Sequence, residues 1–126
     1  MTIYEAVGGE KTFVALVEAF YQGAETDPVL RPMYPPDLGP SKRHLALFLM
    51  QFFGGPRTYD LERGHPRLRM RHMPFRIDQS ARDAWIQHMT AALETIDVPP
   101  AAREEFLRYF ENTATFLINT TAVTGL

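Results

Sequence analysis

The stretch GHPRLRMRHMPFRID, residues 64–78, concentrates four arginines and two histidines in a chain whose formal net charge is −2. Apolar residues and His72 alternate with the arginines, and a half-buried strand with a basic outer face would show the same pattern. A helix that begins at Pro66 and ends at Pro74 also explains it, because Leu68 and His72 then lie four positions apart on one face. The helical interpretation predicts one imidazole projecting from an apolar face.

The segments around this stretch favour the helix. No other segment shows a convincing β alternation, so a lone strand would have no partner. A loop without clear periodicity is expected at 57–65, and the tail from Asn119 is expected to fray. Helices are predicted at 10–24, from Gly39 to Phe53, from Asp78 to Ile96 and from Pro100 to Ile118, with a short one after Asp27. The predicted helix from Gly39 to Phe53 has apolar residues around most of its circumference, so we expect it to be buried on more than one side.

Composition and length limit the class of protein. The 126 residues suffice for one domain, 1–126, and the 45% hydrophobic and 22% charged residues are typical of a globular chain. There is no cysteine, which excludes disulfides and thiolate metal sites. The N-terminal residues lack a secretory signal and no apolar run could span a membrane, so a cytoplasmic protein is expected. The sequence therefore predicts a single all-α domain.

The positive charge is unevenly distributed. Residues 57–83 hold seven arginines against four carboxylates, a net charge of +3 on a weakly acidic chain. A local basic patch of this size indicates an anionic small ligand more readily than nucleic acid, which would need a stronger and more extended field. No nucleic-acid partner is therefore expected.

A flat, iron-bearing, dianionic cofactor would explain these features together. Haem requires an axial nitrogen for its iron, apolar walls for its macrocycle and cations for its two propionates. The chain offers an imidazole on an apolar face, fifteen aromatic residues and flanking arginines. The alternative is that His72 is a structural histidine, satisfied by a backbone carbonyl.

Six segments match one known pattern: AVGGEKTF at 6–13, FY at 20–21, MYP at 33–35, GGPRTY at 54–59, RGHPRLRMRHMPFRID at 63–78 and RDAW at 82–85. Together they resemble the group II truncated haemoglobins over nearly the whole chain. The resemblance implies a truncated globin fold, a two-over-two helical sandwich around haem b (iron protoporphyrin IX).

The resemblance assigns roles on the proximal side of the haem. It implies that His72 is the iron ligand and that Arg71 and Tyr59 reach the propionates. Arg63, Arg67 and Arg69 are then expected to be structural or solvated, because two propionates cannot occupy every cation in this region.

On the distal side, the resemblance places Tyr21, Tyr34 and Trp85 around a bound gas, although core packing alone would also explain each of them. Ser41 falls where a small side chain leaves an opening beside the haem. His44 is expected to face solvent, His65 to cap a loop and His88 to pack on the long helix. The expected haem walls are Leu30, Met33, Leu45, Phe48, Leu49, Leu68, Phe75, Ile77 and Met89.

The resulting functional prediction is reversible binding of dioxygen and other diatomic gases, with slow release because tyrosine and tryptophan donate hydrogen bonds to the ligand. One alternative is a haem-dependent redox enzyme, a peroxidase or nitric oxide dioxygenase served by an unidentified reductase. A third possibility is a helical module without haem that binds anions through Arg67, Arg69 and Arg71. The chain is expected to be a monomer or a homodimer.

Overall fold

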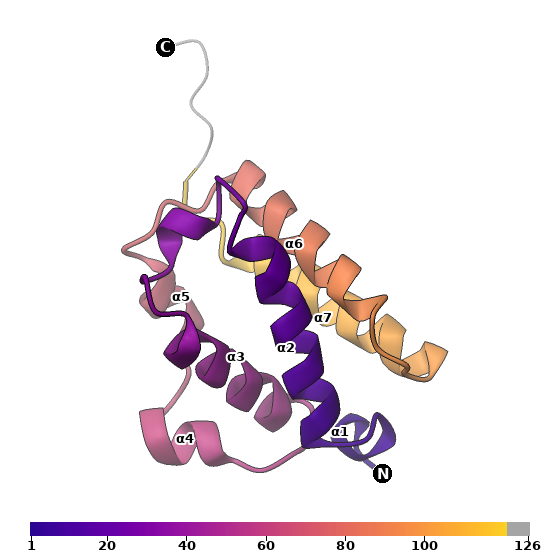
Figure 1. Ribbon diagram of the computed structural model, residues 1–126. Helices are drawn as coiled ribbons and strands as arrows, with labels where there is room; N and C mark the ends of the chain where they lie inside the picture. The colour runs from indigo at the N-terminus through magenta and orange to yellow at the C-terminus, as the bar shows by residue number, and fades with distance from the viewer. Residues whose placement is uncertain (121–126) are drawn as a thin grey trace, which may run out of the picture.

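The computed structural model describes residues 1–120, and every regular element in that range is a helix (Figure 1). This confirms the predicted all-α fold. None of these helices is both long and apolar enough to cross a membrane. The elements are α1 (Ile3–Ala6), α2 (Glu10–Ala24), the 3₁₀ helix η1 (Arg31–Met33), α3 (Gly39–Phe52), α4 (Thr58–Arg63), α5 (Leu68–His72), α6 (Gln79–Leu93) and α7 (Pro100–Phe116).

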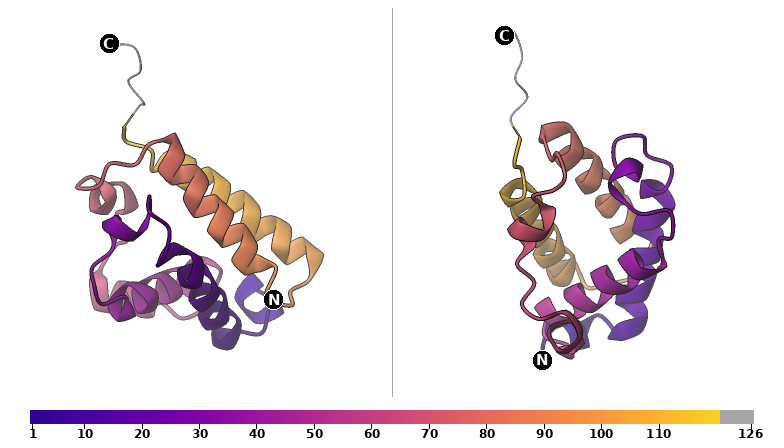
Figure 2. Two further views of the ribbon diagram at one scale, coloured as in Figure 1. Left: turned by 45° about the horizontal axis from the view of Figure 1, so that its top comes forward. Right: turned by 90° about the vertical axis from the view of Figure 1, so that its left-hand side faces the viewer.

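The four long helices form two layers. Helix α2 packs on α3 and α6, and α6 packs on α7. Figure 2 shows α6 and α7 running side by side, with α2 and α3 forming the other pair. Fully buried phenylalanines fill the core; Phe13 of α2 meets Phe106 of α7 with 5.7 Å between ring centroids. This arrangement is the two-over-two sandwich that the resemblance implied.

Helix α2 has the predicted bounds, and its start is set by glycine. Gly8 and Gly9 have φ angles of 102° and 73°, in a region that other residues rarely adopt, so the chain can reverse direction there between α1 and α2. The apolar residues of α2 then recur at helical spacing and form the buried face. Those buried residues are Phe13, Leu16, Val17, Phe20, Tyr21 and Ala24.

The corner after α2 differs in detail from the short helix predicted there. Asp27 caps it as expected, since its Oδ1 accepts hydrogen bonds from the backbone N–H groups of Val29 at 2.8 Å and Leu30 at 3.2 Å. Only the three residues of η1 then form a regular turn. Proline lacks an amide hydrogen and restricts the residue before it, and the Pro35-Pro36 pair prevents a longer helix.

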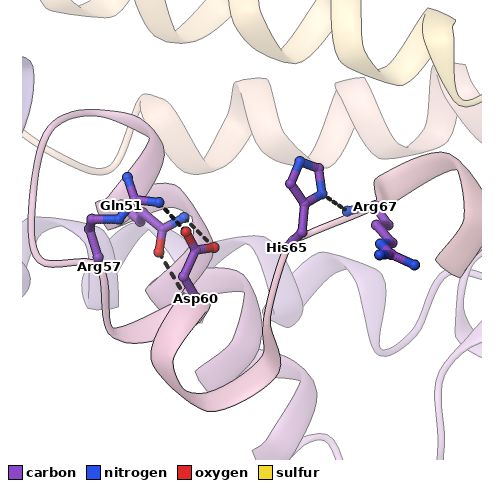
Figure 3. Close-up of polar contacts among 5 residues, drawn as sticks. All are labelled: Gln51, Arg57, Asp60, His65 and Arg67. Carbon is purple, nitrogen blue, oxygen red and sulfur yellow. Dashed lines mark hydrogen bonds and ion pairs between the residues drawn. The ribbon is translucent and has the colours of Figure 1, made fainter.

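The loop predicted at 57–65 is wrong, because Thr58–Arg63 forms α4. Six residues are too few to show a hydrophobic period, and a long-range contact holds them in place. Gln51 of α3 donates from Nε2 to Oδ1 of Asp60 at 2.9 Å and accepts from the Asp60 amide at 3.0 Å (Figure 3). Arg57 pairs with the same carboxylate. The missed helix carries Arg63 to the cavity described below.

Helix α3 is less buried than its composition predicted. Ala46, Leu49 and Met50 are buried, but Phe52 is 51% exposed. Other apolar residues of α3, Leu45 and Phe48, are only partly buried; they pack against the core and also line a cavity. The apolar residues of α3 therefore contact that cavity as well as the protein core.

The expected short helix in the basic stretch is confirmed as α5, and the strand interpretation is wrong. The helix begins at Leu68, two residues later than expected, after Arg67 adopts a left-handed conformation with φ 45°. Asp78 caps α6 as predicted, accepting a hydrogen bond from the Ala81 amide at 2.9 Å.

The chain after α7 is held in place where fraying was expected. Asn119 and Thr120 donate from their amides to the carbonyl oxygen of Ile77 at 2.9 and 3.1 Å. The prediction of a frayed tail is therefore wrong at its first two residues. The rest of that prediction, for 121–126, lies outside the described residues.

Candidate functional site

A cavity of about 380 Å³ lies among α2, α3, α5, α6 and α7. It brings together twelve of the fifteen residues predicted for the site, which are separated by up to 64 positions in the sequence (85 − 21). These are Tyr21, Leu30, Met33, Tyr34, Leu45, Phe48, Leu49, Leu68, His72, Phe75, Ile77 and Trp85.

Three predicted residues do not line the cavity. Met89 is completely buried in the core. Tyr59 is buried beside Phe48, with 5.5 Å between ring centroids. Arg71 is used within the protein: its Nε donates to the carbonyl oxygen of Pro66 at 2.8 Å and its Nη2 to that of Arg63 at 3.1 Å. In the structure, Met89 and Tyr59 thus pack against other side chains, and Arg71 bonds to two backbone carbonyls.

His72 presents one ring nitrogen to the cavity. Its Nδ1 lies 2.6 Å from the carbonyl oxygen of Leu68, one helical turn earlier. A carbonyl oxygen can only accept, so Nδ1 carries a proton and donates; in the neutral imidazole this tautomer has the lone pair of Nε2 available. This contact fixes both the tautomer and the orientation of the ring. A structural histidine was expected to bond to a backbone carbonyl, and His72 does so, but this bond involves only Nδ1 and leaves Nε2 for another partner.

The loop after His72 is fastened by Asn119. The Nδ2 of this asparagine donates to the carbonyl oxygens of His72 at 3.2 Å and Phe75 at 2.9 Å, and its Oδ1 accepts from the Ile77 amide at 2.9 Å. The C-terminal segment therefore holds the segment that carries three cavity residues.

Three polar aromatic side chains gather at the cavity wall formed by α2, the η1 corner and α6. The rings of Tyr21 and Tyr34 meet edge to face, with 5.3 Å between centroids. Trp85 lines the same cavity. Tyr21 is 3% exposed, and Tyr34 and Trp85 are half-buried.

The surroundings of the two tyrosines shift their pKa values. Burial raises the pKa of Tyr34 to about 12, while hydrogen bonding with Tyr21 and Trp85 acts in the opposite direction. Burial raises the pKa of Tyr21 well above its ordinary value; Tyr34 adds to the rise, and the Ser41 hydroxyl opposes it. Both hydroxyls therefore keep their protons at neutral pH and are available as hydrogen-bond donors.

Arg63 and His44, which were expected to be peripheral, both line the cavity. Nη1 of Arg63 lies 3.1 Å from Nε2 of His44. Sequence reasoning missed Arg63 because it missed α4. It also missed Arg82 of α6 and the α7 wall, whose helical spacing indicates burial without distinguishing core from cavity; the α7 lining is Tyr109, Phe110, Thr113, Ala114 and Leu117.

The two remaining histidines lie outside the cavity. His65 is a loop residue as predicted, with Nδ1 accepting from the Arg67 amide at 3.1 Å (Figure 3). His88 of α6 bonds through Nε2 to Oδ2 of Asp27 at 2.7 Å. This contact connects α6, which carries Trp85, to the corner that carries Tyr34.

The Asp27 contact predicts a pH-dependent contribution to stability. The His88 hydrogen bond, aided by backbone amides and opposed by burial, holds the pKa of Asp27 below its usual value. The stabilisation is therefore present above the unfolded-state pKa of about 3.9 and is lost as pH falls through the lower folded-state value. Urea unfolding should show Asp27→Asn less stable than the parent near neutral pH, and this deficit should disappear in strong acid.

Asp97→Asn is the matched control, since Asp97 is exposed. It should leave the free energy of unfolding unchanged across the same pH range. A deficit in Asp27→Asn that persisted at low pH would contradict an origin in the carboxylate.

Comparison with known proteins gives consistent matches over the full sandwich. The family model described as "Bacterial-like globin" matches residues 2–119. The group 2 truncated hemoglobin YjbI of Bacillus subtilis is 39% identical over 118 residues, covering 94% of this chain and 89% of that protein.

Solved structures agree with this result. The hemoglobin of Chloroflexus aurantiacus has a TM-score of 0.93 and 54% identity, covering 95% of this chain and 99% of that one. The truncated oxygen-avid haemoglobin from Bacillus subtilis has a TM-score of 0.90 and 38% identity, covering 94% and 100% of the two chains. At these identities the similarity extends beyond the fold to the family.

Proposed function

Since this chain belongs to the bacterial-like globin family, and within it to the group II truncated haemoglobins, we propose that it binds haem b through His72 and reversibly holds dioxygen. Globins bind haem and diatomic gases. What we propose for this chain is that His72 is the iron ligand and that the bound gas is released slowly. When bound, haem supplies an iron with a coordination position open to a small gas.

The residues of the cavity fit this group. The walls are largely apolar and aromatic, as a macrocycle requires, and the neutral imidazole of His72, with Nδ1 bonded to a carbonyl, has Nε2 available for a metal. The hydrogen bond from Nδ1 to the Leu68 carbonyl makes Nε2 of His72 more basic, and therefore a better ligand for a metal. This arrangement, an imidazole oriented by a backbone carbonyl in a cavity with largely apolar and aromatic walls, is the observation that carries the proposal.

On the other side of the cavity, Tyr34 and Trp85 are positioned to retain a gas. The Tyr34 hydroxyl can donate to the gas, and the one N–H of Trp85, which bonds to Tyr34, would turn from Tyr34 to the gas. Hydrogen bonds to an acceptor that gains negative charge are stronger than neutral ones. The protonated state of Tyr34 is secure at neutral pH because burial raises its pKa. A relative described as oxygen-avid supports slow release as the property to test.

The alternatives are separated by other measurements. Peroxidase or nitric oxide dioxygenase activity, with its reductase, stays a prediction for turnover assays. The haem-free anion module is disfavoured because Arg71 is occupied by two backbone carbonyls and Arg69 lies over the Phe116 ring at 5.2 Å.

Haemin titration tests the proposal directly. The parent protein should give a Soret band that saturates at one haemin per chain, and His72→Ala should bind more weakly with an altered spectrum that added imidazole restores. His65→Ala removes a histidine from the same basic stretch and serves as the control, with a spectrum like that of the parent. A parent protein with no Soret band, or a His72→Ala spectrum identical to it, would overturn the assignment.

A further inference from the structure

Arg63 is a charged cavity residue for which the chain provides no counter-ion. It makes no ion pair with any carboxylate in residues 1–120. The adjacent acid Glu62 pairs with Arg43 at 2.5 Å, and Asp60 of the same helix pairs with Arg57. The guanidinium therefore lines the cavity with its charge uncompensated.

The surroundings of Arg63 hold its side chain in place while leaving one donor unused. Its Nη1 lies 3.1 Å from His44 Nε2, its guanidinium lies 5.9 Å from the centre of the Tyr59 ring, and its carbonyl oxygen accepts from Arg71. Its Nε is buried and has no hydrogen-bond partner, the one such side-chain nitrogen or oxygen found in the described part of the chain. A buried charged donor without a partner is costly, so an external acceptor is expected.

The charge on His44 is consistent with this arrangement. Burial lowers the pKa of His44, and the positive charges of Arg63, Arg43 and Arg71 lower it further, against the opposing effect of Glu62. A neutral imidazole can accept the Arg63 N–H, so the pair presents a single positive charge without internal repulsion. The site thus suits an anion with oxygen acceptors.

We propose that Arg63, oriented by His44, binds one carboxylate of haem, and that Arg71 and Tyr59 act by holding Arg63 in position. This rests on the proposed function, since it takes haem as the ligand. It moves the carboxylate contact from the two residues that the sequence assigned, because neither lines the cavity. A guanidinium can donate two parallel hydrogen bonds to a carboxylate, which matches the unused Nε.

The experiment compares haemin with its dimethyl ester, in which both carboxylates are blocked. Each is loaded into the parent protein and Arg63→Met, and its loss is timed by transfer to excess apomyoglobin. Arg63→Met should release haemin at least about tenfold faster than the parent, because a charge-assisted contact is lost. With the ester, the two proteins should agree within about twofold, since no carboxylate remains to be bound.

Matched variants keep the result interpretable. Arg76→Met removes an exposed arginine from the same basic stretch and should release haemin at the parent rate. His44→Leu removes the acceptor that orients Arg63 and should also speed the loss of haemin more than that of the ester. If Arg63→Met folds poorly, His44→Leu still tests the site.

Three outcomes decide the proposal. A tenfold effect of Arg63→Met confined to haemin supports it. An effect below twofold, or an equal effect on haemin and ester, overturns it while leaving the proposed function intact. Failure of the parent to bind haemin overturns the proposed function itself, and is seen before any variant is measured.

Discussion

Replacing Tyr34 and Trp85 together by phenylalanine is expected to speed the release of dioxygen by about 100-fold or more. Each replacement removes one donor worth about 1–3 kcal/mol to an acceptor that gains charge, and about 1.4 kcal/mol corresponds to a factor of ten. Both side chains line the cavity, and their donors face a partly apolar interior where water cannot easily substitute for them. Stopped-flow displacement of dioxygen from the ferrous protein measures the rate.

The contact between Tyr21 and Tyr34 makes this prediction more specific. Tyr21 is hydrogen-bonded to Tyr34, so Tyr21→Phe should act through Tyr34 and give a smaller acceleration than Tyr34→Phe. In a protein that already carries Tyr34→Phe, adding Tyr21→Phe should change the rate by less than about twofold.

Tyr4→Phe is the control for this series, because Tyr4 stacks on Phe13 away from the cavity lining. It should release dioxygen at the parent rate. Additive effects of Tyr21→Phe and Tyr34→Phe would contradict the action of Tyr21 through Tyr34. Equal rates in the parent and the Tyr34→Phe, Trp85→Phe double variant would contradict the account of ligand retention.

Replacing Asn119 by alanine is expected to lower the free energy of unfolding by about 2–4 kcal/mol, since it removes three hydrogen bonds to backbone groups and leaves those groups without partners. Two of these bonds hold the carbonyl oxygens of His72 and Phe75. The substitution should therefore also loosen the proposed iron ligand, broadening or shifting the iron–histidine stretching band in the Raman spectrum of the ferrous protein.

Asn112→Ala provides the control, because this exposed asparagine lies on α7 near the same end of the chain. It should change stability by less than about 0.5 kcal/mol and leave the Raman band in place. A purely structural role for Asn119 would lower stability without moving the band. That result would contradict the positioning role while leaving the hydrogen bonds themselves unchallenged.

The sequence predicted the elements whose periodicity is long enough to be unambiguous. Helix α2 shows several turns of regular spacing and a glycine start, and its bounds agree with the structure. The Asp78 cap and the helix bearing His72 were predicted from local chemistry, since capping and a proline before the first turn act within a few residues. The short helix α4 was missed, because six residues are stabilised by Gln51 from another helix more than by their own pattern.

Some residues of the candidate site were also predictable from local sequence, and others depended on folding. The sequence pattern, with its resemblance, identified His72 and the three polar aromatic residues, since their types and spacing are specific. It assigned the carboxylate contact to Arg71, whereas Arg63, eight residues earlier and of the same charge, is the one of the two that lines the cavity. The orientation of each guanidinium depends on carbonyls and rings brought close only by folding.

By itself, the sequence thus determined the helical fold of the described residues and most residues of the cavity, because helical periodicity and motif spacing are local properties. Tertiary structure decided which arginines reach the cavity, that Tyr21, Tyr34 and Trp85 line one cavity, and that Asn119 binds the loop after His72. These depend on atoms far apart in the chain meeting within about 3 Å, a distance that no local pattern encodes.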